Sequence, residues 1–122
     1  SAASDVYKRQ GNDCFDVSGG KYSLERGLFY NCGDKGLSIG ENSEFSSDKI
    51  SVDKSYIGIS VKDFSVANLD TLSINSNEIC IESKQKKQEF GGARVSIKNL
   101  NCDKFINASD KNSIININKY EL

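Results

Sequence analysis

The sequence predicts an all-β protein that folds as a parallel β-helix, a solenoid of about five coils of about 22 residues each. Two observations support this prediction. Apolar residues recur 22 positions apart in four rows, and apolar and polar residues alternate within each coil, as in a strand with one buried face. The rows are Phe15, Leu37, Ile59 and Ile81; Val17, Ile39 and Val61; Leu28, Ile50 and Leu72; and Tyr30, Val52 and Ile74.

Short strands joined by tight turns account for one coil. Alternating runs such as Leu37, Ser38 and Ile39 are bounded by Gly, Asn, Asp and Ser clusters at 18–20, 40–43 and 75–77, which favour turns. Each coil then holds two or three strands that pair in parallel with those of the next coil. The handedness of parallel crossovers predicts a right-handed, single-stranded β-helix. The patterns of leucine-rich and helical repeats are absent, so an ordinary β-sandwich is the alternative.

The first ten residues are expected to lie outside the domain. Residues 1–10, S-A-A-S-D-V-Y-K-R-Q, look like the translation of a transposon adaptor used in sequencing-library preparation, fused in frame to an environmental gene fragment. We therefore treat them as a non-native tail, with a natural flexible tail as the alternative. The β-helix domain is expected over residues 11–122 as a truncated fragment, with Gly11 in the middle of a coil. A signal peptide, membrane anchor or cap would then lie upstream.

Composition excludes several classes of function. The 16 basic and 17 acidic residues are interspersed, which gives no electrostatic reason to expect a nucleic acid or a membrane surface as partner. The chain has no His, so Ser-His-Asp catalysis and histidine metal sites are excluded. No run is apolar enough to span a bilayer. A stack about 20 to 25 Å tall would expose a strand edge at each end, which predicts possible end-to-end self-association.

The four cysteines are predicted to be free. Cys14 and Cys80 share one row and Cys32 and Cys102 share another, in each case three coils apart. Three coils correspond to about 14 Å, well beyond the separation of about 7 Å that a disulfide allows between Cα atoms. Small apolar residues in or beside the core are therefore the favoured interpretation, with disulfides or metal ligands as the alternative. Free thiols would leave the cellular compartment undecided.

A row of polar residues is predicted at one corner of the solenoid. Asn31, Asp53 and Asn75 are 22 residues apart, and Asn101 continues the row after an insertion. Stacked side chains of this kind can bond one another and tolerate the left-handed backbone of a tight corner. We expect a structural ladder here rather than ligand binding.

A charged row is the candidate for chemistry. Lys62 and Lys84 share one register beside Glu41 and Asp63, and Asp110 continues the acidic row. The ordinary interpretation is a solvated ladder of ion pairs, each worth about 0 to 1 kcal/mol. The functional alternative is a sugar-binding or catalytic groove, with Glu41 and Asp63 as paired carboxylates and Lys62 or Lys84 as the base.

An insertion interrupts the repeat at 83–92, where the period lengthens by about three or four residues. Insertions in one coil of a solenoid form surface loops, often on the binding face. Lys86, Lys87 and Phe90 are therefore candidate ligand-binding residues. Phe90 could offer an aromatic platform to a sugar ring, but packing against the stack is favoured.

Four segments of the chain resemble a known family. They are G-N-D-C-F-D-V-S-G-G (11–20), C-G-D-K-G-L-S-I-G-E-N-S (32–43), I-G-I-S-V-K-D-F-S (57–65) and K-K-Q-E-F-G-G-A (86–93). These segments resemble bacterial right-handed β-helix proteins of the pectin-lyase-like superfamily, in particular the β-helix region of surface proteins that also carry a spore-coat CotH kinase-like domain. The resemblance implies an extracellular or cell-surface protein that handles, or is attached to, polysaccharide.

Two functions are compatible with these observations. The first is a non-catalytic β-helix module that serves as a structural spacer or as a glycan-binding wall. The alternative is a fragment of a polysaccharide lyase, hydrolase or epimerase acting on acidic glycans. Related lyases hold Ca²⁺ with carboxylates and use Arg or Lys as base, but only Arg26 and Arg94 remain outside residues 1–10. We therefore expect no catalysis and no cofactor, since Ca²⁺ is implied only by the enzyme alternative. Three or more carboxylates converging in a groove within reach of Lys or Arg would favour the enzyme.

Overall fold

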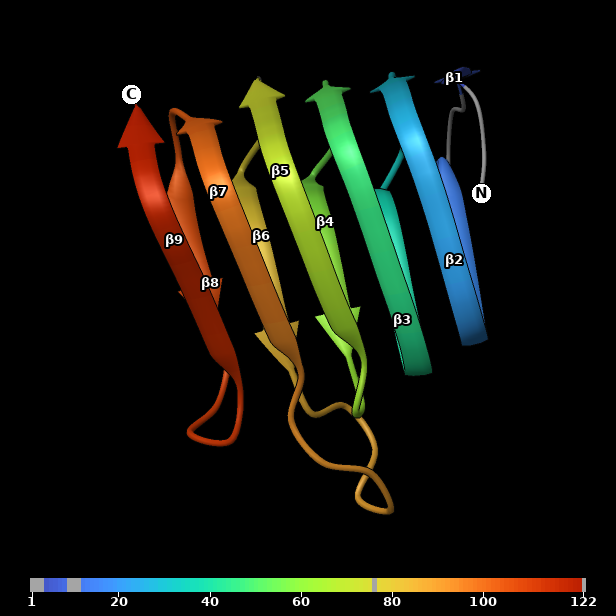
Figure 1. Cartoon of the computed structure of the whole chain (residues 1–122), viewed down its shortest axis with the longest axis vertical. Coiled ribbons are helices and arrows are strands. Elements are labelled where there is room, and N and C mark those ends of the chain that lie inside the picture. Colours follow the sequence, from blue (N-terminus) through green and yellow to red (C-terminus); the bar gives the residue numbers. More distant parts are fainter. Residues whose placement is uncertain (1–3, 9–11, 76, 122) are drawn as a thin grey trace.

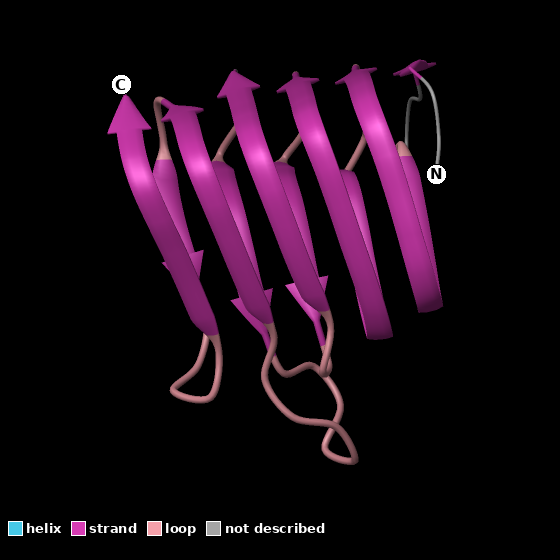
Figure 2. Ribbon diagram, viewed as in Figure 1, coloured by secondary structure: helices cyan, strands magenta, loops and turns pink. Residues whose placement is uncertain are grey.

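The computed structural model describes residues 4–8, 12–75 and 77–121. It confirms an all-β chain that forms a parallel β-solenoid of about five turns, with roughly 22 residues per turn (Figures 1 and 2). The strands are β1 (Ser4–Lys8), β2 (Phe15–Tyr30), β3 (Lys35–Asp53), β4 (Ile57–Lys62), β5 (Val66–Asn75), β6 (Ile79–Lys84), β7 (Arg94–Cys102), β8 (Phe105–Ala108) and β9 (Ile114–Glu121).

The strands form two layers. The front sheet contains the C-terminal halves of β2 and β3 together with β5, β7 and β9, which lie side by side in Figure 1. The back sheet contains the N-terminal halves of β2 and β3 together with β4, β6 and β8, which lie behind. All of the described pairings are parallel. Each turn therefore crosses from the back sheet to the front sheet once.

Bends inside β2 and β3 carry the chain from the back sheet to the front sheet. Gly19 and Gly20 of β2 have φ angles of 74° and 94°, and Glu41 and Asn42 of β3 have φ angles of 45° and 57°. Positive φ suits glycine and is tolerated by asparagine, whereas Glu41 adopts it against its intrinsic preference. The pairing shifts at this bend, because β3 contains one residue more than β2.

The predicted apolar rows are confirmed on the back sheet. Phe15 pairs with Leu37, Leu37 with Ile59, and Ile59 with Ile81. The row of Val17, Ile39 and Val61 is also in register. Equal spacing was sufficient here because the extra residue at the bend of β3 is offset by a corner that is one residue shorter before β4, so the back strands stay 22 positions apart.

The predicted rows are wrong for Leu28 and Tyr30 on the front sheet. Because of the extra residue at the bend of β3, front-sheet partners in β2 and β3 are 23 positions apart instead of the predicted 22. Leu28 is 44% exposed. The residues that take the predicted places are Gly27, which pairs with Ile50, and Phe29, which pairs with Val52.

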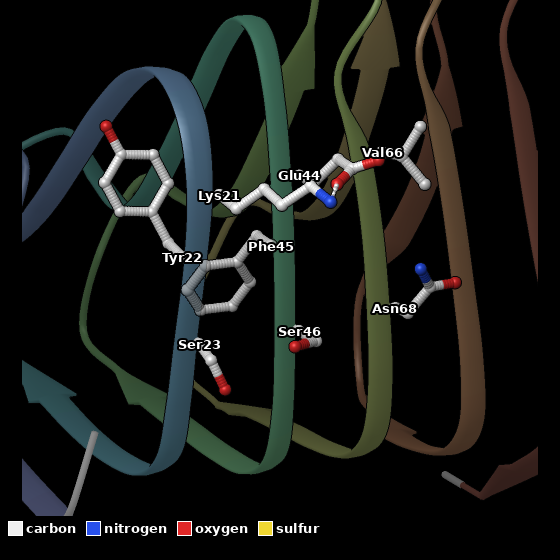
Figure 3. Close-up of a pocket in the computed structure, with 8 residues that line it drawn as sticks. All are labelled: Lys21, Tyr22, Ser23, Glu44, Phe45, Ser46, Val66 and Asn68. Carbon is white, nitrogen blue, oxygen red and sulfur yellow. Dashed lines mark ion pairs between the residues drawn. The ribbon is translucent and has the colours of Figure 1, made fainter. Parts of the chain in front are cut away.

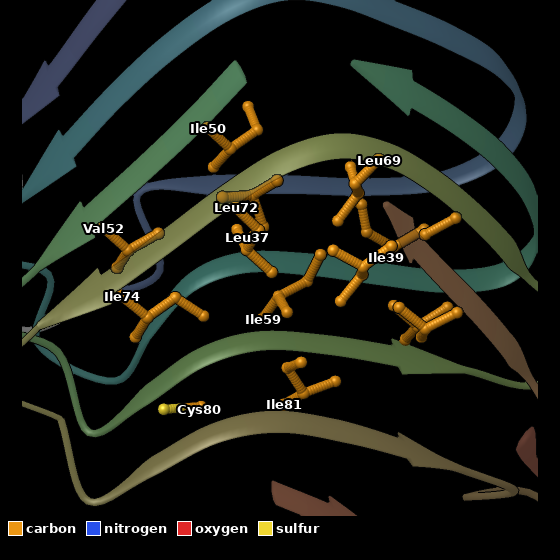
Figure 4. Close-up of a cluster of buried hydrophobic side chains, with 14 of the residues drawn as sticks. Leu37, Ile39, Ile50, Val52, Ile59, Leu69, Leu72, Ile74, Cys80 and Ile81 are labelled. Carbon is orange, nitrogen blue, oxygen red and sulfur yellow. The ribbon is translucent and has the colours of Figure 1, made fainter. Parts of the chain in front are cut away.

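The space between the two sheets is filled by stacked aliphatic side chains (Figure 4). Burial of such a side chain contributes about 1.5 to 3 kcal/mol relative to exposure. The fully buried positions include Leu37, Ile39, Ile50, Val52, Ile59, Leu72, Ile74 and Ile81. The alternation seen in the sequence thus places one side of the strands from β2 to β9 in or against this core.

The insertion lengthens the period by a different amount on each sheet. On the back sheet, Ile59 and Ile81 are partners 22 positions apart and Ile81 and Ile106 are partners 25 positions apart, which confirms the predicted lengthening of about three or four residues. On the front sheet, Glu44 and Val66 are partners 22 positions apart, whereas Val66 and Arg94 are partners 28 positions apart. The loop between Lys84, the last residue of β6, and Arg94, the first residue of β7, therefore contains six extra residues, and the corner that follows β7 is shorter. In Figure 1 this loop projects below the lower ends of the strands.

The prediction of free cysteines is wrong. Disulfides join Cys14 to Cys32, with Cα atoms 5.4 Å apart, and Cys80 to Cys102, with Cα atoms 6.4 Å apart. The prediction compared only cysteines in the same row. Each bridge instead joins a back-strand position of the Cys14 and Cys80 row to a residue at the end of the front strand, at the corner between the two sheets. The predicted row of Cys32 and Cys102 is also wrong, because Cys102 is in register with Ile74, Val52 and Phe29.

The surrounding turns show why this corner accepts a disulfide. A Cβ on Gly36 would lie 2.6 Å from Val52, and a Cβ on Gly58 would lie 2.7 Å from Ile74. One turn further on, the partners of Gly58 and Ile74 are the bridged residues Cys80 and Cys102. In the turn of β6 and β7, the disulfide thus takes the place where the two preceding turns have a glycine against an aliphatic side chain.

Residues 4–8 form a strand although the segment was set apart in the sequence analysis. β1 pairs in parallel with β2, from Ser4 opposite Arg26 to Lys8 opposite Tyr30. The unpaired backbone groups of a sheet edge readily accept another strand, which accounts for the pairing. The adaptor origin of this segment stays a prediction, and Gly11 and Leu122 lie outside the described residues.

The predicted polar ladder is wrong at both of its ends. Asp53 pairs with Asn75, as expected. However, Tyr30 rather than Asn31 pairs with Asp53, and Asn101 pairs with Ser73. Asn31 and Lys54 instead share one conformation: their φ angles are 54° and 63°, and each donates its backbone N–H to the next turn. The corner therefore repeats as a backbone conformation rather than as one side-chain type.

Candidate functional site

A small cleft on the outside of the back sheet brings together most of the predicted charged residues. The cleft has a volume of about 140 Å³, and Asp16 of β2 forms part of its wall. Of the predicted residues, it collects Glu41, Lys62, Asp63, Lys86 and Lys87. We call this hollow the lysine cleft.

Asp63 is committed to the backbone. It follows β4, is only 1% exposed, and has a φ angle of 52°. Its carboxylate accepts the backbone N–H of Lys86 at 2.6 Å and that of Lys87 at 3.0 Å. The paired-carboxylate chemistry predicted for Asp63 would require it to release these bonds, so its role here is to hold the insertion loop.

Glu41 is occupied by an ion pair. Its carboxylate accepts a hydrogen bond from the ammonium group of Lys87, on the insertion loop. This hydrogen bond and the charge of Glu41 raise the pKa of Lys87. The pair therefore links the bend of β3 to the loop across the mouth of the lysine cleft.

Lys62 lies at the end of β4 and is half-buried. Its ammonium group donates a hydrogen bond of 2.9 Å to Oγ of Ser38 on the neighbouring strand. Burial lowers the pKa of Lys62, and the positive charges of Lys35 and Lys86 lower it further. Lys62 is thus a cation held among other cations.

Lys84 lies outside the lysine cleft. It pairs with Lys62 in the strand register, as predicted, but its ammonium group lies 3.2 Å from the carboxylate of Glu82. Glu82 is 7% exposed and also accepts a 2.7 Å hydrogen bond from the hydroxyl group of Ser60. Lys84 therefore neutralises a buried carboxylate on its own strand, rather than pairing with Glu41 or Asp63.

Phe90 also lies outside the lysine cleft. Its ring meets that of Phe64 edge-on, with centroids 6.1 Å apart. Phe90 is half-buried, and the backbone of Gly91 lies against the Phe64 ring with no room for a side chain. The two rings thus pack the insertion loop onto the turn that follows β4.

Asp110 is placed in the next turn beyond the insertion loop. Its carboxylate accepts the backbone N–H of Gln85 at 2.6 Å, the hydroxyl of Ser113 at 2.8 Å and the backbone N–H of Asn112 at 3.1 Å. The bond from Gln85 is the main reason why the pKa of Asp110 is lowered. Asp63 and Asp110 therefore both accept hydrogen bonds from the backbone of the insertion loop, one from the turn before it and one from the turn after it.

A larger hollow that the sequence analysis missed lies on the outer face of the front sheet. Three adjoining hollows of about 440, 490 and 370 Å³ share lining residues, among them Asn68. Together they form one shallow depression across the strands, which we call the front groove. Its floor consists of small polar residues that pair in succession from β2 to β9: Ser23, Ser46, Asn68, Ser96 and Asn116.

Ion pairs stand beside this polar floor. Lys21 and Glu44 lie 3.5 Å apart at one side (Figure 3), and Asp70 and Lys98 lie 3.3 Å apart at the other. All four side chains are largely exposed, so each pair contributes about 0 to 1 kcal/mol. The groove therefore presents hydroxyl and amide groups between opposite charges that compensate one another.

Irregular spacing concealed the front groove in the sequence. Successive floor residues are separated by 23, 22, 28 and 20 positions, because a bend residue and the insertion intervene. A search for a fixed interval of 22 therefore misses them. The available signal was a polar position between two inward-facing apolar ones, such as Asn68 between Ala67 and Leu69 or Ser96 between Val95 and Ile97.

No protein-family model, curated protein or solved structure matches the chain. The class that can be stated is a parallel β-solenoid of about five turns with two disulfides. Within the described residues, no helix is long and apolar enough to cross a membrane. The same residues contain no group of three or more Cys, Asp or Glu side chains that could hold a metal ion.

Proposed function

We propose that this chain is a non-catalytic β-solenoid module of a bacterial secreted or surface protein, and that it binds an extended polysaccharide along the front groove. The observation that carries the proposal is the floor of the groove. There, five small polar side chains, one from each front strand from β2 to β9, lie in successive pairing between ion pairs.

The spacing of the floor suits a repeating, hydroxyl-rich ligand. Neighbouring strands in a sheet are about 4.8 Å apart, which is close to the length of one sugar unit in an extended glycan. Serine hydroxyl groups and asparagine amides both donate and accept hydrogen bonds, as sugar hydroxyl groups do. Because the floor residues stand on paired strands, their positions are held by the sheet rather than by loops.

Two further arguments support an extracellular location. Disulfides persist mainly in oxidising compartments, and this chain has two in about 90 residues, one near each end of the stack. The resemblance of segments 11–20, 32–43, 57–65 and 86–93 to bacterial surface β-helix proteins points to the same location.

The lysine cleft gives weaker support to the enzyme alternative. Three carboxylates and three lysines line it, which is the composition expected of a glycan-cleaving site. However, Asp63 accepts two backbone N–H groups and Glu41 is paired with Lys87. Neither carboxylate is free to serve as nucleophile or base, so we do not propose catalysis.

Blocking the groove tests the proposal. Wild type and the variant Asn68→Tyr are screened on a glycan array, and binders are quantified by isothermal titration calorimetry. Asn68 lines all three parts of the groove, so a large ring there should abolish polysaccharide binding. Ser73→Tyr is the matched control, since Ser73 lies on the same strand, five positions further on, outside the groove.

Two results would contradict the proposal. One is equal affinity of wild type and Asn68→Tyr for every glycan bound. The other is a wild type that binds no glycan on the array, which would leave the module as a structural spacer. Cleavage of a bound acidic glycan by wild type, lost in Lys62→Ala, would instead support the enzyme alternative.

A further inference from the structure

Two of the three lysines that line the lysine cleft have no carboxylate of their own within ion-pair distance among the described residues. Asp63 is buried and satisfied by backbone N–H groups, and Glu41 is paired with Lys87. Within the described part of the chain, Lys62 and Lys86 form no ion pair with a carboxylate. Within the described residues, the cleft thus combines two ammonium groups that form no ion pair and two carboxylates whose oxygens already accept hydrogen bonds.

The remaining carboxylate, Asp16, does not change this balance. Asp16 is exposed on the strand next to Ser38 and attracts Lys62 through its charge, but no ion pair joins the two. Burial and the charges of Lys35 and Lys86 outweigh this attraction, because the pKa of Lys62 is lowered on balance. Lys62 is therefore held in a position where an additional negative charge would be favourable.

We propose that the lysine cleft is an anion-binding site in which Lys62 and Lys86 hold one small oxyanion group, such as a carboxylate, sulfate or phosphate. The volume of about 140 Å³ suits such a group. Charge-assisted hydrogen bonds from ammonium groups to oxyanions are the stronger class of hydrogen bond.

The site is distinct from the front groove. The lysine cleft is formed by residues of the back sheet and the insertion loop, whereas the groove lies on the outer face of the front sheet. Asp63 fixes the backbone of Lys86 and Lys87 over the cleft, and Ser38 orients the ammonium group of Lys62. The anion would therefore meet donors that are already positioned before it binds.

The test is a titration of the folded chain with sodium sulfate, sodium phosphate and sodium glucuronate, followed by two-dimensional ¹H–¹⁵N NMR. We expect amide shifts centred on Glu41, Lys62 and Lys86, with affinity in about the millimolar range that falls as NaCl is added. Comparison of the three anions shows whether the site takes free inorganic anions or the carboxylate of an acidic sugar.

Three variants complete the test. Lys62→Gln keeps a donor to Ser38 and should weaken binding about tenfold or more. Lys86→Gln, at an exposed loop position, should do the same without affecting folding. Lys98→Gln removes a front-sheet lysine and should bind as wild type does. Binding unaffected by both cleft variants, or the absence of shifts at the cleft with all three anions, would overturn the proposal. Asn68→Tyr should leave anion binding intact, which separates this result from the outcome for the groove.

Discussion

At the scale of single residues, two carboxylates hold one loop. Asp63 accepts the backbone N–H groups of Lys86 and Lys87 from the turn before the loop, and Asp110 accepts that of Gln85 from the turn after it. An insertion leaves backbone groups without partners in the neighbouring turns, and each carboxylate replaces some of those partners. The acidic row predicted as a possible catalytic set thus has an identified structural role.

Asp63 provides the first prediction. Replacement of Asp63 by Ala leaves two backbone donors unsatisfied and should lower the free energy of unfolding by about 1 to 3 kcal/mol. Asp63→Asn should lower it less, since Asn keeps one acceptor oxygen and tolerates the positive φ angle. Urea unfolding followed by circular dichroism measures both. An unchanged midpoint for Asp63→Ala would contradict the role of Asp63 as the anchor of the loop.

Asp110 should make stability depend on pH. Its pKa in the folded chain is lowered, first by the N–H of Gln85 and then, against the opposing effect of burial, by Ser113 and Asn112. A carboxyl group with a lowered folded pKa stabilises the fold above its unfolded pKa, and this contribution is lost as the pH falls through the folded pKa. Asp110→Asn should therefore be less stable than wild type at neutral pH.

The difference in stability between wild type and Asp110→Asn should disappear at acidic pH. Urea midpoints of wild type and Asp110→Asn are compared from pH 7 downward to about pH 2 to 3, below the ordinary pKa of about 3.9 for Asp. A difference between the two proteins that stays constant over this range would show that the charge of Asp110 contributes nothing to stability.

At the scale of strands, the solenoid depends on glycine where two sheets meet at a corner. Gly36 of β3 faces Val52 and the carbonyl oxygen of Gly58 at distances that exclude a Cβ. Gly40 of the same strand has its nearest such neighbour, Cε of Lys62, at 3.5 Å. The sequence does not distinguish the two glycines, but in the structure a Cβ has no room at Gly36 and has room at Gly40.

The two glycines form a matched pair of substitutions. Gly36→Ala should lower the free energy of unfolding by about 1 to 3 kcal/mol, because it overpacks a rigid corner. Gly40→Ala should be close to neutral, since ordinary van der Waals contact surrounds it. Thermal and urea unfolding of both variants provide the measurement. Equal changes in the free energy of unfolding at the two positions would show that the effect of the substitution comes from backbone entropy rather than from packing.

At the scale of the whole molecule, the two disulfides lie near opposite ends of a short stack. Cys14 and Cys32 bridge the first turn, and Cys80 and Cys102 bridge the turn with the insertion. A stack of about five turns buries its end rows incompletely, so the terminal turns gain most from a covalent link. The closed loops span 18 and 22 residues.

Removing a bridge should reduce stability measurably. Loop-closure entropy for loops of this length predicts a loss of about 3 kcal/mol for the double variant Cys80→Ala with Cys102→Ala. The variant Cys14→Ala with Cys32→Ala should lose a similar amount. Denaturant unfolding with and without dithiothreitol checks both, and the reductant should have no further effect on a chain that lacks all four cysteines. If dithiothreitol did not change the stability of the wild type, the assignment of the two disulfides would be wrong.

The outer edge of β9 should promote association. Ile114 and Tyr120 of β9 are 40% and 45% exposed, and β9 has no described partner on its outer edge. An unpaired strand edge with exposed apolar side chains tends to pair with another chain. Sedimentation velocity should show concentration-dependent association of wild type, reduced in Ile114→Lys. A strictly monomeric wild type at high concentration would count against end-to-end pairing.

Individual positions show which parts of the fold could be predicted from the sequence. Alternation and a constant interval were sufficient to align Phe15, Leu37, Ile59 and Ile81, because periodic burial is a local property of each strand. One extra residue at Glu41–Asn42 displaced Leu28 and Tyr30 from their predicted rows. A pattern in one dimension does not reveal where such a residue is absorbed.

Periodicity in the amino-acid order was therefore enough to establish a parallel solenoid with about five turns and its apolar interior. Only the folded chain showed three features. These are the pairing of the four cysteines, the hydrogen bonds from the insertion loop to Asp63, and the alignment of the residues that form the front groove. The physical reason is distance: each depends on rows from different sheets, or on residues displaced by bends and insertions, coming together at a corner or on one face. The spacing along the chain does not encode that proximity.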